Sequence, residues 1–241
     1  VRTFHNITSE AKDITVLGLK SETVDKLITM ANPSSSMDEN NSGQMMRVTH
    51  YLLLNGNMDL VGESQLLQDA GSLLAEESAG WLERDQQGKR LSFNYNYWSS
   101  MVSAQGAPNN SDYSVSQVLM DGTDSKNPKV IKFDDRYWIA DSGRSNPITI
   151  SNYWIWKFLG TADIYEEWYH IGSTGTLATG EGFTMKGTDG GAGINDLQNY
   201  VFKGKPHNGD FTRIVSGNQN YLVGNPYPSA INAAEFILDN L

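Results

Sequence analysis

Phe93-Asn-Tyr-Asn-Tyr-Trp-Ser-Ser100 packs four aromatic residues into eight positions. In residues 93–97 the rings alternate with asparagine, a period of two that places three rings on one face of a β-strand. Trp98 departs from this alternation, which predicts a bend or bulge where the strand ends. The stretch therefore predicts a strand that presents aromatic rings on one side.

Downstream of this stretch, short strand-like segments recur every 10–20 residues with glycine-rich turns between them. Such spacing is typical of a β-sandwich. Residues 228–238 are expected to form one helix, because Ala233, Phe236 and Ile237 recur at helical intervals after a proline and a serine. No closing strand follows before Leu241, so the domain is expected to continue beyond the sequence.

Upstream, residues 45–74 hold strands of three to five residues separated by glycine-containing corners at about ten-residue spacing. The Asn55-Gly56 turn favours a hairpin, whereas short, uneven strands favour a β-solenoid. Residues 32–44 are polar throughout and predict a loop. The fold expected is all-β, with a strand-rich solenoid-like or layered part over residues 1–80. An incomplete, aromatic-rich β-sandwich with one short C-terminal helix follows over residues 81–241.

Composition excludes several classes of function. The 241 residues carry a net charge of −10, which opposes binding to nucleic acid and to anionic lipid. No cysteine is present, so disulfides, thiolate metal sites and cysteine nucleophiles are excluded. No apolar run approaches the ~20 residues that a membrane span needs, so membrane insertion is not expected. The first residue, Val1, indicates a mature or internal fragment.

Six tryptophans and eleven tyrosines suggest a glycan-binding surface, because aromatic rings stack on the C–H faces of sugars. The candidates for this platform are Trp154, Trp156, Trp168 and Tyr169. In residues 153–158 the alternation sends Trp154 and Trp156 to one face and Ile155 to the other. The competing interpretation is that these rings form the core, since aromatic side chains dominate sandwich interiors.

Calcium is the one cofactor that the loops suggest. Asp121 and Asp124 lie in one aspartate-rich turn, and Asp189 and Asp196 in another, and hard carboxylate oxygens suit Ca²⁺. Neither turn has the spacing of an EF-hand loop, and Asp-Gly is also a common turn dipeptide. The alternative to calcium binding is therefore that these aspartates only stabilise turns.

No catalytic residue is predicted. None of the four histidines has a metal-ligand spacing to another. The doublets Asp134-Asp135 and Glu166-Glu167 could supply carboxylates for a polysaccharide-acting enzyme. Adjacent residues on a strand point to opposite faces, so neither doublet is itself a catalytic pair.

Five motifs resemble, in their order, a module of large secreted surface proteins of gliding Bacteroidetes. The motifs are Asp85-Gln-Gln-Gly88, Tyr95-Asn-Tyr-Trp-Ser-Ser100, Gly180-Glu-Gly-Phe-Thr-Met-Lys-Gly187, Phe202-Lys-Gly-Lys-Pro206 and Leu222-Val-Gly-Asn-Pro-Tyr-Pro-Ser-Ala230. The resemblance covers roughly residues 45–241. It implies export by the type IX secretion system and an extracellular or cell-surface location, and it carries no assigned chemistry.

We therefore expect a non-catalytic, structural or adhesive cell-surface module that binds surface glycans. Two alternatives stay open. One is a polysaccharide-acting enzyme, and the other is a cargo captured with the type IX export machinery.

Overall fold

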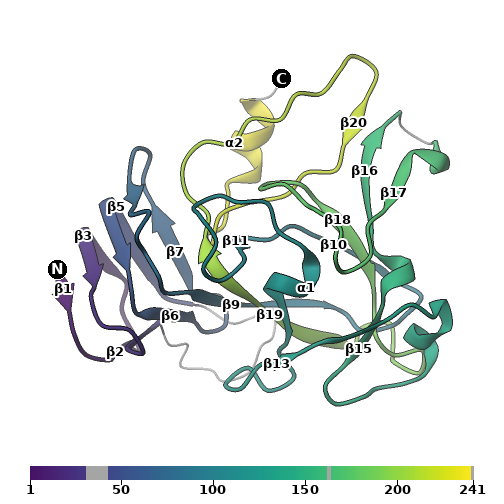
Figure 1. Ribbon diagram of the computed structural model, residues 1–241, viewed down its shortest axis with the longest axis horizontal. Helices are drawn as coiled ribbons and strands as arrows, with labels where there is room; N and C mark the ends of the chain where they lie inside the picture. Colours follow the sequence, from purple (N-terminus) through teal and green to yellow (C-terminus); the bar gives the residue numbers. More distant parts are fainter. Residues whose placement is uncertain (31–42, 162–163, 240–241) are drawn as a thin grey trace.

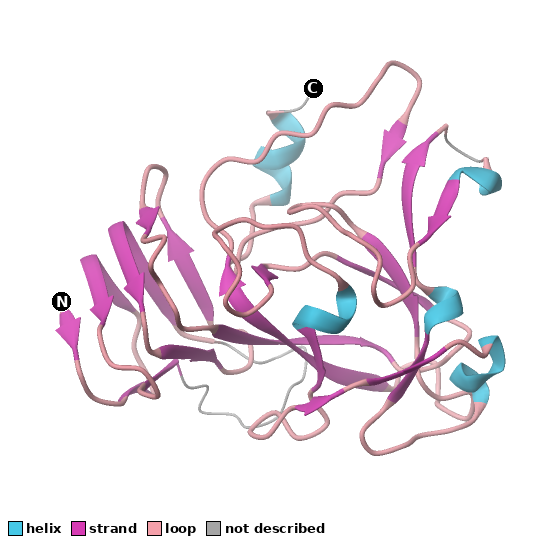
Figure 2. Ribbon diagram, viewed as in Figure 1, coloured by secondary structure: helices cyan, strands magenta, loops and turns pink. Residues whose placement is uncertain are grey.

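The computed structural model describes residues 1–30, 43–161 and 164–239 (Figures 1 and 2). Strands dominate these residues, so the predicted all-β class is confirmed. Most of the loop expected at residues 32–44 lies outside the described residues. Within the described ranges, every helix is too short or too polar to span a bilayer.

The N-terminal strands form two parallel sheets between which the chain alternates. The first sheet contains β1 (Arg2–Thr3), β3 (Ile14–Ser21), β5 (Met45–Leu54), β7 (Gln65–Gln68) and β8 (Leu73–Leu74). The second contains β2 (Ile7–Ser9), β4 (Leu27–Met30), β6 (Asn57–Leu60) and β9 (Leu82–Lys89). Each turn of the chain adds one strand to each sheet, in parallel with the previous turn. This arrangement is a β-solenoid, seen as the stack of strands at the left of Figure 1.

The Asn55-Gly56 corner joins β5 to β6, which lie in different sheets, so it is not a hairpin. Its glycine is needed for close packing. A Cβ at Gly56 would lie 2.4 Å from Ser21 Oγ, and one at Gly80 would lie 1.7 Å from the carbonyl oxygen of Gly56. Successive corners thus stack directly on one another, and a side chain at either glycine would force them apart.

The interior of the solenoid is built from ladders of apolar side chains in register. Leu19 pairs with Leu52, and Leu52 with Leu74; Ile28 pairs with Met58, and Met58 with Leu82. Leu52, Met58 and Leu82 have no exposed surface. The period of two in each strand keeps these side chains inside and sends their neighbours outward.

One sheet continues from the solenoid into the rest of the molecule. β9 pairs in parallel with β6 on one edge and antiparallel with the long strand β19 (Leu197–Pro206) on the other. Beyond β19 follow β12 (Leu119–Asp121) and β13 (Lys129–Val130), and β11 (Val102–Ser103) also pairs with β19. This sheet contains strands from both sides of residue 80, where the sequence predicted a boundary between a solenoid-like part and a sandwich. That boundary stays a prediction.

A second antiparallel sheet has the order β10 (Tyr95–Trp98), β18 (Phe183–Lys186), β16 (Trp156–Gly160) and β17 (Trp168–His170), with β20 (Asn220–Tyr221) paired to β16. The remaining strands, β14 (Lys132–Asp134) and β15 (Thr149–Ser151), pair in parallel. The short helices are α1 (Val115–Val118), α2 (Ala233–Leu238), η1 (Tyr137–Asp141), η2 (Asn152–Trp154) and η3 (Tyr165–Glu167).

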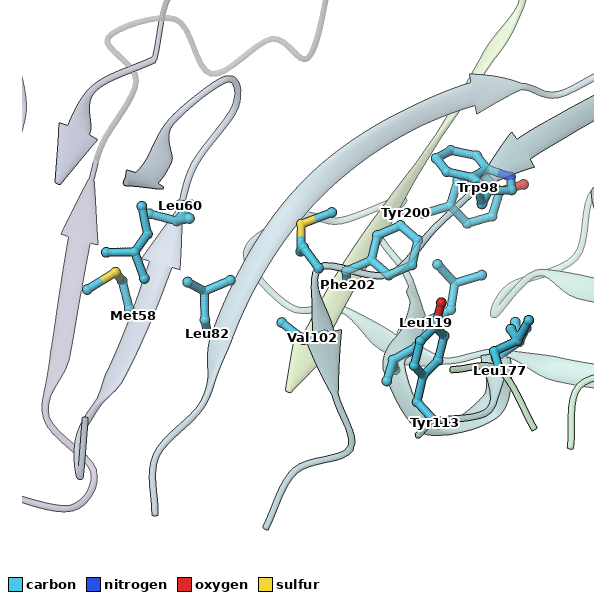
Figure 3. Close-up of a cluster of buried hydrophobic side chains, with 14 of the residues drawn as sticks. Met58, Leu60, Leu82, Trp98, Val102, Tyr113, Leu119, Leu177, Tyr200 and Phe202 are labelled. Carbon is cyan, nitrogen blue, oxygen red and sulfur yellow. The ribbon is translucent and has the colours of Figure 1, made fainter. Parts of the chain in front are cut away.

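The two antiparallel sheets pack on each other around Trp98. Its ring centroid lies 5.4 Å from that of Tyr200 and 5.9 Å from that of Phe202, both on β19. Figure 3 shows the apolar side chains running from Met58 and Leu82 in the solenoid to Phe202 and Trp98 in the sandwich-like part. The fold therefore has one continuous core.

Two local predictions differ from the structure. Phe93 lies in a turn, and the strand begins at Tyr95. Trp98 does not break the alternation: Tyr95 and Tyr97 point outward, while Asn96 and Trp98 are buried together on the inner face. The C-terminal helix begins only at Ala233, where the Asn232 side chain accepts hydrogen bonds from the amides of Ala234 and Glu235. A cap of this kind fixes the start of a helix.

Candidate functional site

The outer face of the sheet β10–β18–β16–β17 carries a row of aromatic side chains. Strand pairing places Tyr97 opposite Thr184, Thr184 opposite Trp156, and Trp156 opposite His170. Directly paired residues project from the same face of a sheet. The next rows of this face hold Tyr95 beside Lys186 and Phe158 beside Trp168. We call this surface the aromatic face.

Trp154 joins the aromatic face from the 3-10 turn η2. Its ring centroid lies 6.2 Å from that of Tyr95 in an edge-to-face arrangement. The Nζ of Lys186 lies 3.6 Å from the Trp154 ring centroid and 5.4 Å from that of Tyr95. Such a cation above a ring is attracted by the negative face of the π system. Burial against these rings lowers the pKa of Lys186.

The indole groups are held in fixed orientations by the protein itself. Trp154 Nε1 donates to the carbonyl oxygen of Tyr137 at 2.8 Å, and Trp156 Nε1 donates to that of Tyr153 at 2.7 Å. The Tyr153 ring lies between them, with its centroid 4.6 Å from that of Trp154 and 6.3 Å from that of Trp156. Because the polar edges are already bonded, the indoles can offer only their apolar surfaces to a ligand.

Three connected hollows follow the aromatic face. The first, of about 180 Å³, is lined by Tyr95, Tyr97, Trp156, Tyr165, Trp168 and Thr184. The second, of about 450 Å³, shares Tyr97, Tyr165 and Trp168 with the first and extends to Tyr221 and Leu222. The third, of about 330 Å³, shares Tyr97 and Leu222 with the second. The shared residues make the three hollows one groove.

The groove combines exposed tyrosine rings with half-buried tryptophan rings. Tyr97 is 65% exposed and Tyr165 72% exposed. Burial raises the pKa of Tyr95 and of Tyr221 to about 12. A phenol with a raised pKa keeps its proton near neutral pH and can donate a hydrogen bond. The groove thus combines apolar ring faces with a few neutral polar groups, as binding sites for small ligands do.

Of the four residues predicted as a glycan platform, the structure brings three together. Trp154, Trp156 and Trp168 all lie on or beside the aromatic face. Tyr169 lies on the opposite face of β17, paired with Lys157, and is 55% exposed there. The prediction omitted Tyr95, Tyr97 and Tyr165. The alternation in residues 93–97 was the available signal for the first two.

The aspartates predicted to bind calcium are occupied by the chain itself. Asp121 is buried and accepts from the amides of Thr123 at 2.8 Å and Ile148 at 2.9 Å. Asp124 accepts from the amide of Lys126 at 3.3 Å. These are the contacts of structural turns.

Asp189 and Asp196 both lie beside the positively charged guanidinium of Arg90. Arg90 lies 2.7 Å from a carboxylate oxygen of Asp196 and 3.7 Å from one of Asp189. Both carboxylates also accept from backbone amides, those of Gly191 and Gly193. Among the described residues, no group of three or more potential metal ligands occurs. These carboxylates are therefore bonded to donors of the chain itself, and calcium binding stays a prediction.

Three of the four carboxylates in the doublets, those of Asp134, Asp135 and Glu167, bond to neighbouring groups of the chain. Asp134 forms a bidentate ion pair with Arg136, at 2.9 and 2.6 Å, and this pair lowers the pKa of Asp134 to about 2. Asp135 accepts from the Asn152 amide at 2.8 Å, and Glu167 accepts from the amide of Thr161. A general acid for glycoside hydrolysis needs a raised pKa, so Asp134 is unsuited to that role.

The chain belongs to the family DUF8693, a domain of unknown function whose sequence model matches residues 5–241. No curated protein and no solved structure matches the chain.

Proposed function

We propose that this member of the DUF8693 family is a non-catalytic module that binds carbohydrate along the aromatic face. One observation carries the proposal: the rings of Tyr95, Tyr97, Trp156, Tyr165 and Trp168 converge on one groove. A protein gains stability from aromatic side chains mainly by burying them. Exposed rings gathered in a groove are better explained by a ligand with apolar C–H faces.

The shape of the groove supports an extended ligand. The three hollows together run from Trp156 past Tyr97 to Leu222, and rings line the first two along their length. Beside the rings, the hydroxyl group of Tyr95 can donate a hydrogen bond, and that of Tyr221, which donates to Glu181 at 3.0 Å, can still accept one. An oligosaccharide offers this alternation of apolar faces and hydroxyl groups along its chain.

We further propose that the module acts at the cell surface as an adhesive or structural part of a larger secreted protein. The resemblance to exported surface proteins of gliding Bacteroidetes supports this location. It also supports passage through the type IX export machinery, which would make that machinery a transient partner.

The proposal is tested on a glycan array, followed by calorimetric titration of each positive glycan. Trp156→Ala and Trp168→Ala remove rings from the groove and are expected to weaken binding about tenfold each, which corresponds to ~1.4 kcal/mol. Tyr169→Ala is the matched control, because Tyr169 lies on the same strand as Trp168 but on its opposite face. Its affinity should stay within about twofold of the wild type.

Two results would contradict the proposal. Binding that Tyr169→Ala weakens as much as Trp168→Ala would place the site elsewhere. Release of new reducing ends from a bound glycan would show an enzyme in place of a binding module.

A further inference from the structure

The third hollow of the groove contains an arginine with no acidic partner. It lies where the last solenoid strand, β9, meets residues 222–230, and Arg84 projects into it from β9. Arg84 Nε is inaccessible to solvent and makes no hydrogen bond. Its NH1 group reaches only the sulfur of Met101, at 3.9 Å. Among the ion pairs of the described residues, none includes Arg84.

A charge in this position is costly unless something compensates it. Arginine keeps its proton in proteins, so it cannot escape by becoming neutral. Burial lowers the pKa of Arg84, and only the more distant charges of Glu63 and Asp85 oppose this. Asp85 itself is engaged elsewhere, accepting from the Asn199 amide at 2.8 Å. Arg84 is half-buried, and a charge held partly out of water without an ion-pair partner favours a negatively charged ligand beside it.

A second unused donor lines the same hollow. Trp98 is 8% exposed, and its Nε1 group is buried without a hydrogen bond. Buried polar groups without partners are rare in proteins. Arg84 Nε and Trp98 Nε1 together mark this hollow as a place that lacks a hydrogen-bond acceptor.

Residues 222–230 are firmly attached, so the hollow is preformed. The side chain of Asn225 donates to the carbonyl oxygen of Ser229 at 2.5 Å and accepts from the amide of Tyr227 at 3.0 Å. The carbonyl oxygen of Pro228 accepts from the amide of Leu66, in the solenoid, at 2.9 Å. The corner that these residues form therefore cannot collapse onto Arg84 without breaking bonds.

We infer that this hollow binds the carboxylate of an acidic sugar, so that the ligand of the aromatic face is a uronate-containing saccharide. The inference rests on the proposed carbohydrate binding. Tyr97 lines all three hollows, so a saccharide lying on the rings extends directly to Arg84. The planar guanidinium fork matches a carboxylate in shape and charge. The guanidinium of Arg84 lines this hollow and supplies the donors for the carboxylate.

The test compares tetragalacturonate and tetramannuronate with their methyl esters, which keep the size of each ligand and remove its charge. In calorimetric titrations of the wild type, at least one free acid should bind at least tenfold more tightly than its ester. Arg84→Met should abolish this difference and leave the affinity for the ester within about twofold. Trp156→Ala should weaken acid and ester by the same factor. Arg84→Lys, which keeps the charge but removes the planar guanidinium fork, should reduce the preference for the acid about threefold.

The outcomes separate this inference from the proposed function. If neutral glycans bind in a Trp156-dependent manner while neither acid exceeds its ester, the acidic-sugar inference is wrong and carbohydrate binding stands. If sulfated tetrasaccharides bind as tightly as the uronates, the assignment of a carboxylate is wrong. If no saccharide binds at all, both proposals fail. Thermal unfolding of Arg84→Met and Arg84→Lys shows whether each variant is folded, and the titrations of either folded variant decide the question.

Discussion

In both the solenoid and the aromatic face, successive side chains alternate between the two faces of a strand. In the solenoid the large apolar side chains lie inside, whereas on the aromatic face large tyrosine rings lie outside. In the solenoid, residues such as Leu52, Leu54 and Met58 are wholly buried, and they form the apolar interior. On β10 the large rings of Tyr95 and Tyr97 are outside, while Asn96 and Trp98 are inside. Burial of apolar surface stabilises a fold, so the first region accounts for stability and the second for recognition.

The largest expected difference between the two regions is the cost of removing a side chain. Leu54→Ala opens a cavity in the solenoid interior, where Leu54 has no exposed surface, and should lower the free energy of unfolding by about 3 kcal/mol. Urea denaturation measures this loss. A cost below ~1 kcal/mol would show that the stacked ladders are not the stabilising element.

The regions should also differ in their response to alkaline pH. Asp59 on β6 is half-buried opposite Glu83 on β9, and burial, followed by the charge of Glu83, raises its pKa to about 7. Because the folded pKa exceeds the unfolded one, this stabilising contribution is present below pH ~4 and is lost as the pH rises through 7. Asp59→Asn should therefore be more stable than the wild type at pH 8, by about 2–3 kcal/mol, and equal to it at pH 4.

Denaturation of both proteins at the two pH values provides the measurement and its internal control. Equal stabilities at pH 8 would show that Lys203, whose positive charge lowers the pKa of Asp59, neutralises the site fully.

His207, at the end of the sandwich strand β19, should produce the opposite dependence. It is buried near the rings of Tyr113 and Phe211, and burial lowers its pKa to about 4. The folded pKa lies below the unfolded value, so stability is present above pH ~6.5 and is lost as the pH falls toward 4. Between pH 7.5 and 5 the wild type should lose about 2 kcal/mol through this group.

His207→Phe should remove that part of the slope, as chemical denaturation across the range would reveal. A slope unchanged by the substitution would show that acid destabilisation arises from other groups.

The sequence predicted the strands and the aromatic surface but not the partners of each strand. The Asn55-Gly56 dipeptide favoured a hairpin because glycine is usually read as a conformational signal. Here Gly56 is required by its distance from Ser21 and Lys26, which are remote in sequence. The prediction also grouped Tyr169 with Trp168, although the two side chains lie on opposite faces of β17. The η3 turn before β17 sets which of Trp168 and Tyr169 faces the groove, and no residue pattern specifies that phase.

The third hollow lay beyond sequence reasoning altogether. Arg84, Trp98 and Leu222 meet there only because β9 pairs with β19 while β10 pairs with β18 in the facing sheet. Residue types alone describe Arg84 as one more polar residue in a polar stretch. Its lack of an ion pair becomes visible only when every neighbouring element is in place.

The smallest expected effect concerns the exposed rings themselves. Tyr97→Ala and Tyr165→Ala remove side chains that are 65% and 72% exposed, so each should change the free energy of unfolding by less than ~0.5 kcal/mol. The same substitutions should weaken a bound saccharide severalfold, because Tyr97 lines all three hollows and Tyr165 two of them. Urea denaturation and calorimetric titration of the same samples give both numbers. A loss of stability as large as that of Leu54→Ala would assign these rings to the core, and the contrast between the two regions would then disappear.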